Sequence, residues 1–331
     1  MDPFTRAKRV PTGGFTLVEL LMVMMLLGIV LGVGLGMLTG LAPAERAVPG
    51  LIEETLRMSQ RSAAVLGTPA RVEFSGSTIQ AQVMRPVGTW HFEDRSLMGA
   101  QGLEAVWLGA NDPPFTAQGY EGLGLNLAAG APGVLEISVA SDPAFDWSDG
   151  FSIRFALRAE EWRDSIVMQA GNGLLVALSA RGALGVEFRA VSVDEAGNES
   201  RGERVAVQTE PGAMVQNRWK DVEIVYDRRS LRILVDGLER VRRSEQARVW
   251  IGQPEILLSN KTRPFPGVLD RLVFHVQEIL PPRVLPGDAT FLADTPKQVV
   301  FAPGGGLDPL VHPAEVRIGW QVPEGRPEFL R

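Results

Sequence analysis

The stretch Phe151-Ser-Ile-Arg-Phe-Ala-Leu-Arg158 carries a large apolar side chain at every second position. Alternate side chains of a β-strand point to opposite faces, so this stretch predicts a strand with one face on a core. Similar short stretches follow at regular spacing, at Leu174–Leu178, Gly185–Phe188, Arg204–Val207, Trp219–Tyr226, Leu231–Val235 and Leu269–Val276. The Asp236-Gly237 pair is a strong hairpin signal. Many short strands separated by turns predict an antiparallel β-sandwich.

The composition of the 331-residue chain fits this expectation. With 45% hydrophobic and 22% charged residues the chain is not a disordered tail, and 36 glycines and 23 prolines favour many turns. The length favours about two domains, each able to bury its own core. Because the sequence has no cysteine, disulfides, thiolate zinc sites and a cysteine nucleophile are excluded. The net charge of −6 gives little electrostatic support for nucleic-acid binding, so we expect no such partner.

The N-terminal region contains a predicted membrane span. Of the 28 residues from Phe15 to Ala42, 20 are hydrophobic and one, Glu19, is charged. As a helix the segment would be about 42 Å long, enough to cross a hydrocarbon core of about 30 Å. Arg6, Lys8 and Arg9 precede it, so the positive-inside rule predicts a cytoplasmic N-terminus. A cleaved secretory signal has a shorter apolar region of about 7–15 residues, which makes that alternative a poor fit.

The run Gly13-Gly14-Phe15-Thr16-Leu17-Val18-Glu19-Leu20 closely resembles the leader and helix start of type IV pilins and pseudopilins. The resemblance implies that a prepilin peptidase removes residues 1–14 by cutting after Gly14 and that Phe15 is then N-methylated. It also implies an assembly role for Glu19, whose carboxylate would pair with the charged N-terminus of a neighbouring subunit in a filament. The alternative is a glutamate that snorkels to the membrane surface in an ordinary anchor.

A helix and a hairpin follow the predicted span. Residues 51–66 have the apolar periodicity of an amphipathic helix, and Arg71–Phe74 and Thr78–Val83 alternate as two strands around a turn. This layout resembles the headgroup of H-class minor pseudopilins. The stretches Pro296–Gly306 and Ala314–Trp320 resemble the closing strands of the same headgroup. We therefore expect residues 43–115 to form a spine helix and the first part of this headgroup, and residues 285–331 to complete it.

The middle of the chain resembles a second family. The stretches Trp219–Asp227, Leu231–Gly237 and Pro266–Leu272 follow the order of motifs in laminin G-like, concanavalin A-like jelly rolls. The resemblance covers residues 120–278. If the closing headgroup strands lie beyond it, the jelly roll is an insertion; the alternative is three parts in tandem. The expected fold class is α+β, with an N-terminal helix, a pilin-like β-meander and an antiparallel β-sandwich.

The sequence offers little support for catalysis. The densest acidic group, Asp194, Glu195 and Glu199, does not match the E-x-D-x-E strand of jelly-roll glycosidases, because Gly197 and Asn198 interrupt it. No G-x-S-x-G nucleophile elbow is present either. We therefore expect a protein that is not an enzyme.

Two kinds of ligand site remain open in the jelly roll. Its family often holds calcium through a few oxygen ligands, and the candidates are Asp142, Asp146, Asp149, Asn198 and Asn260, although residues of these types more often serve as turn residues or strand-end caps. No other cofactor is expected. Exposed aromatic rings are the usual platform for sugars, and Trp162 and Trp250 stand among charged or turn residues, whereas Trp219 is expected in the core.

These observations predict a minor pilin or pseudopilin of a type IV pilus or a type II secretion system. It would be a single-pass inner-membrane protein with its globular part in the periplasm. Its partners would be the prepilin peptidase and N-methyltransferase, other pilins, and a glycan or a secreted protein. The alternative is a surface adhesin or carbohydrate-binding protein that uses the pilin helix as an anchor.

Overall fold

The computed structural model describes residues 17–18, 21–27, 43–128, 133–139, 145–252, 255–323 and 326–330. Gly14, Phe15 and Glu19, on which the predicted processing and assembly depend, lie outside the described residues, as does most of the predicted span. Within that span, residues 17–18 and 21–27 are helical and exposed. In the described parts of the chain, no helix combines the length and apolar character needed to cross a membrane.

The helix α2 (Pro43–Leu66) begins eight residues earlier than the sequence periodicity predicts and contains Pro49. Its buried face includes Val48, Ile52 and Ala63. Two buried hydroxyls on this face bond within the helix, because Thr55 Oγ1 donates to the Leu51 carbonyl at 2.8 Å and Ser59 Oγ donates to the Thr55 carbonyl at 3.0 Å. With these polar groups satisfied and their side chains small, the helix can pack closely on the strands beside it.

The strands that pack with α2 come from both ends of the described chain. They are β1 (Ala70–Ser75), the first part of β2 (Thr78–Trp90), β17 (Arg283–Val284) and β19 (Gln298–Phe301). A small separate sheet joins β18 (Thr290–Phe291), β20 (Ile318–Gln321) and β21 (Glu328–Leu330), and the short 3₁₀ helix η2 (Pro286–Asp288) precedes it. Ile52, Val72, Ile79, Phe301 and Trp320 belong to one apolar cluster, which we call the headgroup core.

The remaining strands form an antiparallel, jelly-roll-like β-sandwich, as predicted. Their bounds are β3 (Ala105–Trp107), β4 (Phe115–Thr116), β5 (Gly124–Asn126), β6 (Leu135–Ser138), β7 (Phe151–Ala159), β8 (Ser165–Ala170), β9 (Leu174–Leu178), β10 (Leu184–Val193), β11 (Glu199–Gln208), β12 (Lys220–Tyr226), β13 (Ser230–Val235), β14 (Leu238–Ser244), β15 (Glu255–Leu258) and β16 (Gly267–Ile279). One sheet has the order β11-β10-β9-β8-β15-β6-β3. The other begins β14-β13-β12-β7-β16. The apolar residues of β7 are at most 1% exposed, because they fill the space between the sheets.

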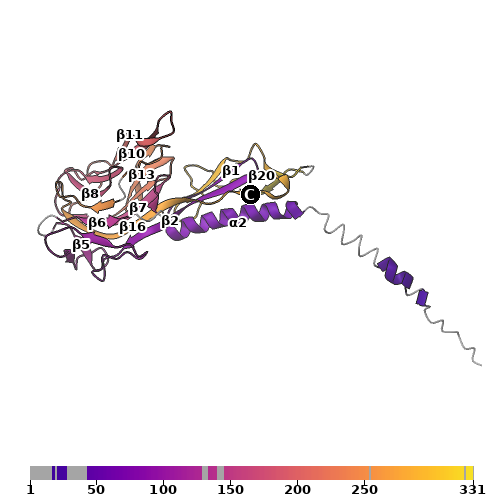
Figure 1. Cartoon of the computed structure of the whole chain (residues 1–331), viewed down its shortest axis with the longest axis horizontal. Helices are drawn as coiled ribbons and strands as arrows, with labels where there is room; N and C mark the ends of the chain where they lie inside the picture. The colour runs from indigo at the N-terminus through magenta and orange to yellow at the C-terminus, as the bar shows by residue number, and fades with distance from the viewer. Residues whose placement is uncertain are drawn as a thin grey trace, which may run out of the picture.

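The larger sheet continues from the sandwich into the headgroup. β2 is 13 residues long and pairs with β1 near its start and with β16 over the rest of its length, so the sheet order runs on as β16-β2-β1-β19. Figure 1 shows the result: the sandwich lies at one end and α2, β1 and β20 extend from it. A shared sheet gives the two parts a rigid connection.

The sandwich core includes residues that precede its predicted start at residue 120. Val87, Trp90, Phe92 and Ala105 are buried in the larger core, and β3 pairs with β6. The reason is the length of β2, whose pleat carries apolar side chains from one core into the next. On the other side, β19 pairs with β1 with Ala70 opposite Phe301, so the chain returns to the headgroup after the sandwich.

Candidate functional site

The outer face of the seven-stranded sheet contains a shallow groove. Along β9, Leu174, Val176 and Leu178 point into the core, and the residues between them point outward. Outward residues on three neighbouring strands are small: Ala177 on β9 lies opposite Gly185 on β10, and Ala206 lies on β11. Because these side chains are short, the sheet surface is hollowed, and the groove has a volume of about 390 Å³.

Arginine side chains line the groove. Arg189 on β10 lies directly opposite Arg204 on β11, and both pair with Glu187, with nitrogen-to-oxygen distances of 3.9 Å and 2.6 Å. Arg201 and Arg263 line the groove or the adjoining hollow of about 190 Å³. Two like charges directly across a sheet repel each other, so one carboxylate shared between two guanidinium groups leaves positive charge unbalanced.

One donor in this arrangement has no acceptor. The Nε atom of Arg189 is buried and makes no hydrogen bond within the described residues. The lining acids are Glu187 and Asp164, and Asp164 Oδ1 already accepts a hydrogen bond of 2.9 Å from the Ala180 amide. Buried polar groups are normally satisfied, so a water molecule or a ligand that accepts a hydrogen bond from Arg189 Nε would complete this arrangement.

The tryptophans predicted as a sugar platform are both half-buried. Trp162 packs against the sandwich core with its ring beside Gly182, and Trp250 lies beside Gly252. Neither lines the groove described above. A carbohydrate platform at these two rings stays a prediction.

Trp219, which the sequence places in the core, is half-buried like Trp162 and Trp250 and is not a core residue. The residue precedes β12, and the inward positions of that strand are the even-numbered Val222, Ile224 and Tyr226, so position 219 faces outward. Its ring contacts Tyr120 edge to face, with centroids 5.7 Å apart, and the Arg158 guanidinium lies 5.5 Å from its ring centroid. The alternation of inward positions within β12 was the signal that could have predicted this.

The residues predicted as calcium ligands have other partners where the structure describes them. Asp142 lies outside the described residues. Asp146 caps a turn at the Ser148 amide, Asp149 pairs with Arg228 and Arg248, Asn198 bonds to Asp194, and Asn260 Oδ1 accepts from Thr262 and Arg263. Among the described residues no group of three or more acidic or histidine side chains is placed to hold a metal ion. Calcium binding stays a prediction.

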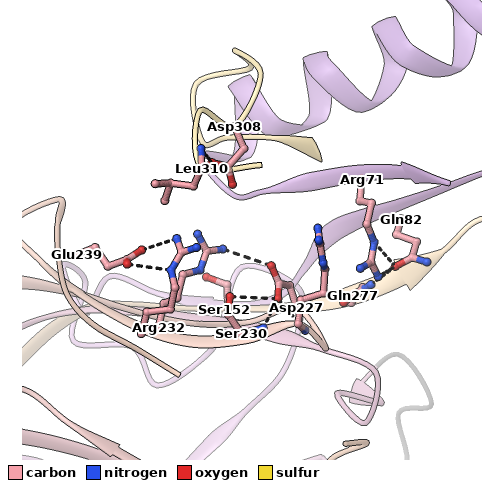
Figure 2. A network of polar contacts seen from close by, with 12 residues as sticks. Arg71, Gln82, Ser152, Asp227, Ser230, Arg232, Glu239, Gln277, Asp308 and Leu310 are labelled. Carbon is pink, nitrogen blue, oxygen red and sulfur yellow. Dashed lines mark hydrogen bonds and ion pairs between the residues drawn. The ribbon is translucent and has the colours of Figure 1, made fainter. Parts of the chain in front are cut away.

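A second polar cluster lies on the outer face of the larger sheet, where the sandwich meets the headgroup. Figure 2 shows Asp308, on the loop after β19, facing this cluster. Asp227 Oδ1 accepts from the Arg229 and Ser230 amides at 3.0 and 2.9 Å, and Asp227 Oδ2 lies 3.5 Å from Arg232 Nη2. Arg242 forms a two-bond pair with Glu239 at 2.9 and 2.8 Å, which raises the pKa of that guanidinium.

The same cluster continues to the first headgroup strand. Arg71 Nε donates to Gln82 Oε1 at 3.1 Å, and Gln277 on β16 donates to the same oxygen. Burial lowers the pKa of Arg71. We call the two groups of contacts together the junction cluster. It joins residues from β1, β2, β13, β14 and β16 across the boundary between the two cores (Figure 2).

Two titratable groups are buried farther along this face. Burial, with the nearby Arg154 charge as a smaller cause, lowers the pKa of His275 to about 4, and its Nδ1 has no hydrogen-bond partner within the described residues. Burial raises the pKa of Glu223, whose Oε1 accepts a bond of 3.3 Å from Ser152 Oγ. His275 is therefore neutral at pH 7.

The described structure and the N-terminal sequence together define a β-sandwich protein with a prepilin-type start. Residues 11–35 match the model of the prokaryotic N-terminal methylation motif. The predicted processing and assembly residues Gly14, Phe15 and Glu19 all lie in this segment, so the expected resemblance to the pilin family is confirmed for it. The motif implies processing by a prepilin peptidase, assembly with other pilins and membrane anchoring.

Comparisons with whole proteins are less specific. No curated protein matches the chain. Among solved structures, the chain is similar to the binding domain of Paraclostridial Mosquitocidal Protein 1, with 13% identity, a TM-score of 0.46 and coverage of 59% of this chain and 49% of that one. It is also similar to the Botulinum neurotoxin serotype G binding domain, with 12% identity, a TM-score of 0.44 and coverage of 57% of this chain and 47% of that one. A third similar structure is domain 4 of the arabinanase AbnA from Geobacillus stearothermophilus, solved in complex with arabinotriose. Its identity is 12% and its TM-score 0.44, and the match covers 60% of this chain and 95% of that one. The chain thus spans about half of the two toxin binding domains.

Proposed function

We propose that this protein is a minor pilin or pseudopilin, a structural and recognition subunit of a type IV pilus or a type II secretion pseudopilus. The methylation motif at residues 11–35 carries the proposal. After cleavage behind Gly14, the helix from Phe15 would anchor the subunit in the inner membrane, with the globular part in the periplasm, and would enter the filament on assembly. The subunit has no enzymatic role in this proposal.

The arrangement of the described chain supports this function. A headgroup formed by α2, β1, the start of β2 and the strands from β17 onward, with the sandwich inserted between them, accounts for the pairing of β1 with β19 and of β2 with β17. An inserted sandwich that shares a sheet with the headgroup would be held in a fixed orientation. Since a module of this size would crowd a shaft made of identical subunits, we assign the protein a low-copy position.

Mass spectrometry of the mature N-terminus tests the proposal. The protein, purified from membranes of a strain with its prepilin peptidase, is expected to begin at N-methylated Phe15. In a strain without the peptidase, the same protein should retain residues 1–14. An N-terminus elsewhere in the peptidase-positive strain would contradict the proposal, because cleavage by the prepilin peptidase after Gly14 leaves Phe15 as the first residue.

A second function, an adhesin anchored by the pilin helix, is supported by the arginine-lined groove of the seven-stranded sheet. The two functions differ in whether the protein must assemble into a filament to act. A minor pilin should lose its role when Glu19 is replaced, whereas an anchored adhesin should keep its ligand binding at the cell envelope. Comparing envelope binding with filament incorporation in that variant distinguishes them.

A further inference from the structure

The groove on β8–β11 has the chemistry of a site for an anion. Four arginines line it and the adjoining hollow, against the two acids Glu187 and Asp164, on a chain whose net charge is −6. Guanidinium groups that lie close together, such as those of Arg189 and Arg204, repel each other, and a bound anion would offset that repulsion. Arginine is also the side chain best suited to carboxylates and sulfates, because its planar fork donates two parallel hydrogen bonds.

The form of the groove points to an extended ligand held by side chains. Its floor is the face of a sheet whose backbone groups are already paired between β9, β10 and β11. A peptide that adds to a sheet pairs with the outer edge of a strand, here that of β11, and would lie beside this floor and not on it. Ser179, Gln208 and Gln169 line the groove or the adjoining hollow with groups that can bond to hydroxyls. A ligand that offers carboxylates to the arginines and hydroxyl groups to these polar side chains is an acidic saccharide.

The lining also disfavours two other ligands. No aromatic side chain lines either hollow among the described residues. Single-stranded nucleic acid is usually bound by a basic groove together with aromatic rings on which bases stack. Neutral sugars likewise depend on aromatic faces. This lining therefore favours a ligand that is recognised mainly through ionic contacts with the arginines.

We infer that this groove and the adjoining hollow bind a chain of acidic sugars, with Arg204 and Arg263 as the principal contacts in the groove and Arg189 in the hollow. Arg189 Nε, which is buried without a partner, supplies a donor that the ligand would satisfy. The inference deepens the proposed function, since it rests on the sandwich being presented outside the cytoplasm. It identifies the ligand class of the binding module.

The test measures binding of an oligogalacturonate to the full chain in nonionic detergent by calorimetry. The matched ligand control is the methyl ester of the same oligomer, which keeps the sugar but lacks the charge. We expect binding that weakens with added salt, and at least tenfold weaker binding of the ester. The double variant Arg189→Gln/Arg204→Gln should lose at least tenfold in affinity, whereas the control Arg218→Gln, an exposed residue outside the groove, should stay within twofold.

A second variant protects the test against misfolding. Arg263 lies on a loop, so Arg263→Gln leaves the strands unchanged, and it should also weaken binding at least fivefold. Equal affinity of all variants, equal affinity for the ester, absence of binding, or tighter binding of single-stranded DNA would each overturn the inference. A mature N-terminus at N-methylated Phe15 together with any of these results would leave the proposed function standing, so the two failures are distinguishable.

Discussion

The carboxylate of Asp270 accepts a hydrogen bond of 2.8 Å from the backbone amide of Tyr120, which lies 150 residues earlier in the chain. The same side chain accepts from the Glu121 amide at 3.1 Å and from the Arg271 amide at 2.7 Å. Asp270 is fully buried, and burial raises its pKa. One carboxylate on β16 therefore fixes the loop that places Tyr120 against Trp219.

Replacing Asp270 should destabilise the sandwich. Asp270→Ala leaves three backbone amides without their acceptor, and each unsatisfied buried group costs about 1–3 kcal/mol, so we expect a loss of about 3 kcal/mol in the free energy of unfolding. Asp270→Asn keeps one acceptor oxygen and should lose less. Urea unfolding followed by tryptophan fluorescence measures both. A loss below about 1 kcal/mol for the alanine variant would mean that water replaces the carboxylate.

Acid should destabilise the protein through His275. Its pKa is about 4 in the folded protein and about 6.5 in an unfolded chain, so the unfolded state binds more protons between these values. The contribution is absent above about pH 7 and grows as the pH falls from 6.5 to 4, reaching up to about 3 kcal/mol of lost stability. Glu223, whose pKa is raised, acts in the opposite direction.

The comparison of His275→Asn with the unchanged protein isolates this effect, because Glu223 is present in both. Melting temperatures measured from pH 8 to pH 4 should fall less steeply in the variant. Parallel pH profiles would show that another group causes the acid sensitivity.

The junction cluster should depend on Asp227 more than on Glu239. Asp227 accepts from two backbone amides and faces the buried Arg232, so Asp227→Ala leaves a buried cation without its partner, and we expect a loss of about 3 kcal/mol. Glu239→Ala removes an exposed pair with Arg242 and should cost about 0.5 kcal/mol. Chemical unfolding of the two variants side by side tests the difference, and equal losses would contradict it.

The paired arginines of the groove should cost stability in the absence of a ligand. Arg189→Gln relieves the repulsion from Arg204 and should leave the free energy of unfolding unchanged or raise it by about 0.5 kcal/mol. Glu187→Gln removes the shared carboxylate and should lower stability, most clearly at low salt. Unfolding curves at two salt concentrations measure both effects. Destabilisation by Arg189→Gln would indicate that this arginine is structural.

Assembly should depend on Glu19. We expect Glu19→Ala to insert into the membrane and to be cleaved normally, but to be missing from filaments, because the ion pair that aligns the subunit is lost. Immunoblots of membrane and sheared filament fractions measure this. Glu19→Asp serves as the control, since it keeps the charge. Normal incorporation of the alanine variant would refute the assigned role.

Much of the strand arrangement was predictable from local patterns. The alternation from Phe151 to Arg158 corresponds to β7, and Asp236-Gly237 forms the turn between β13 and β14 with positive φ angles of 54° and 75°. The length of β2 was not predictable in the same way. Its central residues alternate less regularly, because this strand serves two cores and changes the face it buries. Residues before the predicted start of the sandwich at residue 120, such as Trp90 on β2, therefore contribute to its core.

The groove could not be predicted as a site, although its residues could be placed on strands. Alternation along β10 puts Glu187 and Arg189 on the outer face, but only the register with β11 brings Arg204 opposite Arg189. Arg263 comes from a loop nearly 60 residues beyond Arg204 in the chain. The junction cluster has the same origin, since Arg71 and Gln277 come from strands far apart in the sequence.

The sequence by itself determined the prepilin motif and the β-rich class of the protein, because both depend on residues that are neighbours in the chain. A prepilin peptidase recognises a short linear motif. The two faces of a strand follow from the alternation of apolar and polar residues along it. Only the tertiary structure decided that one sheet runs through both cores, that Asp270 fixes a loop 150 residues away and that four arginines gather around the groove and its adjoining hollow. These features depend on strand order and register, which long-range packing selects and no local pattern contains.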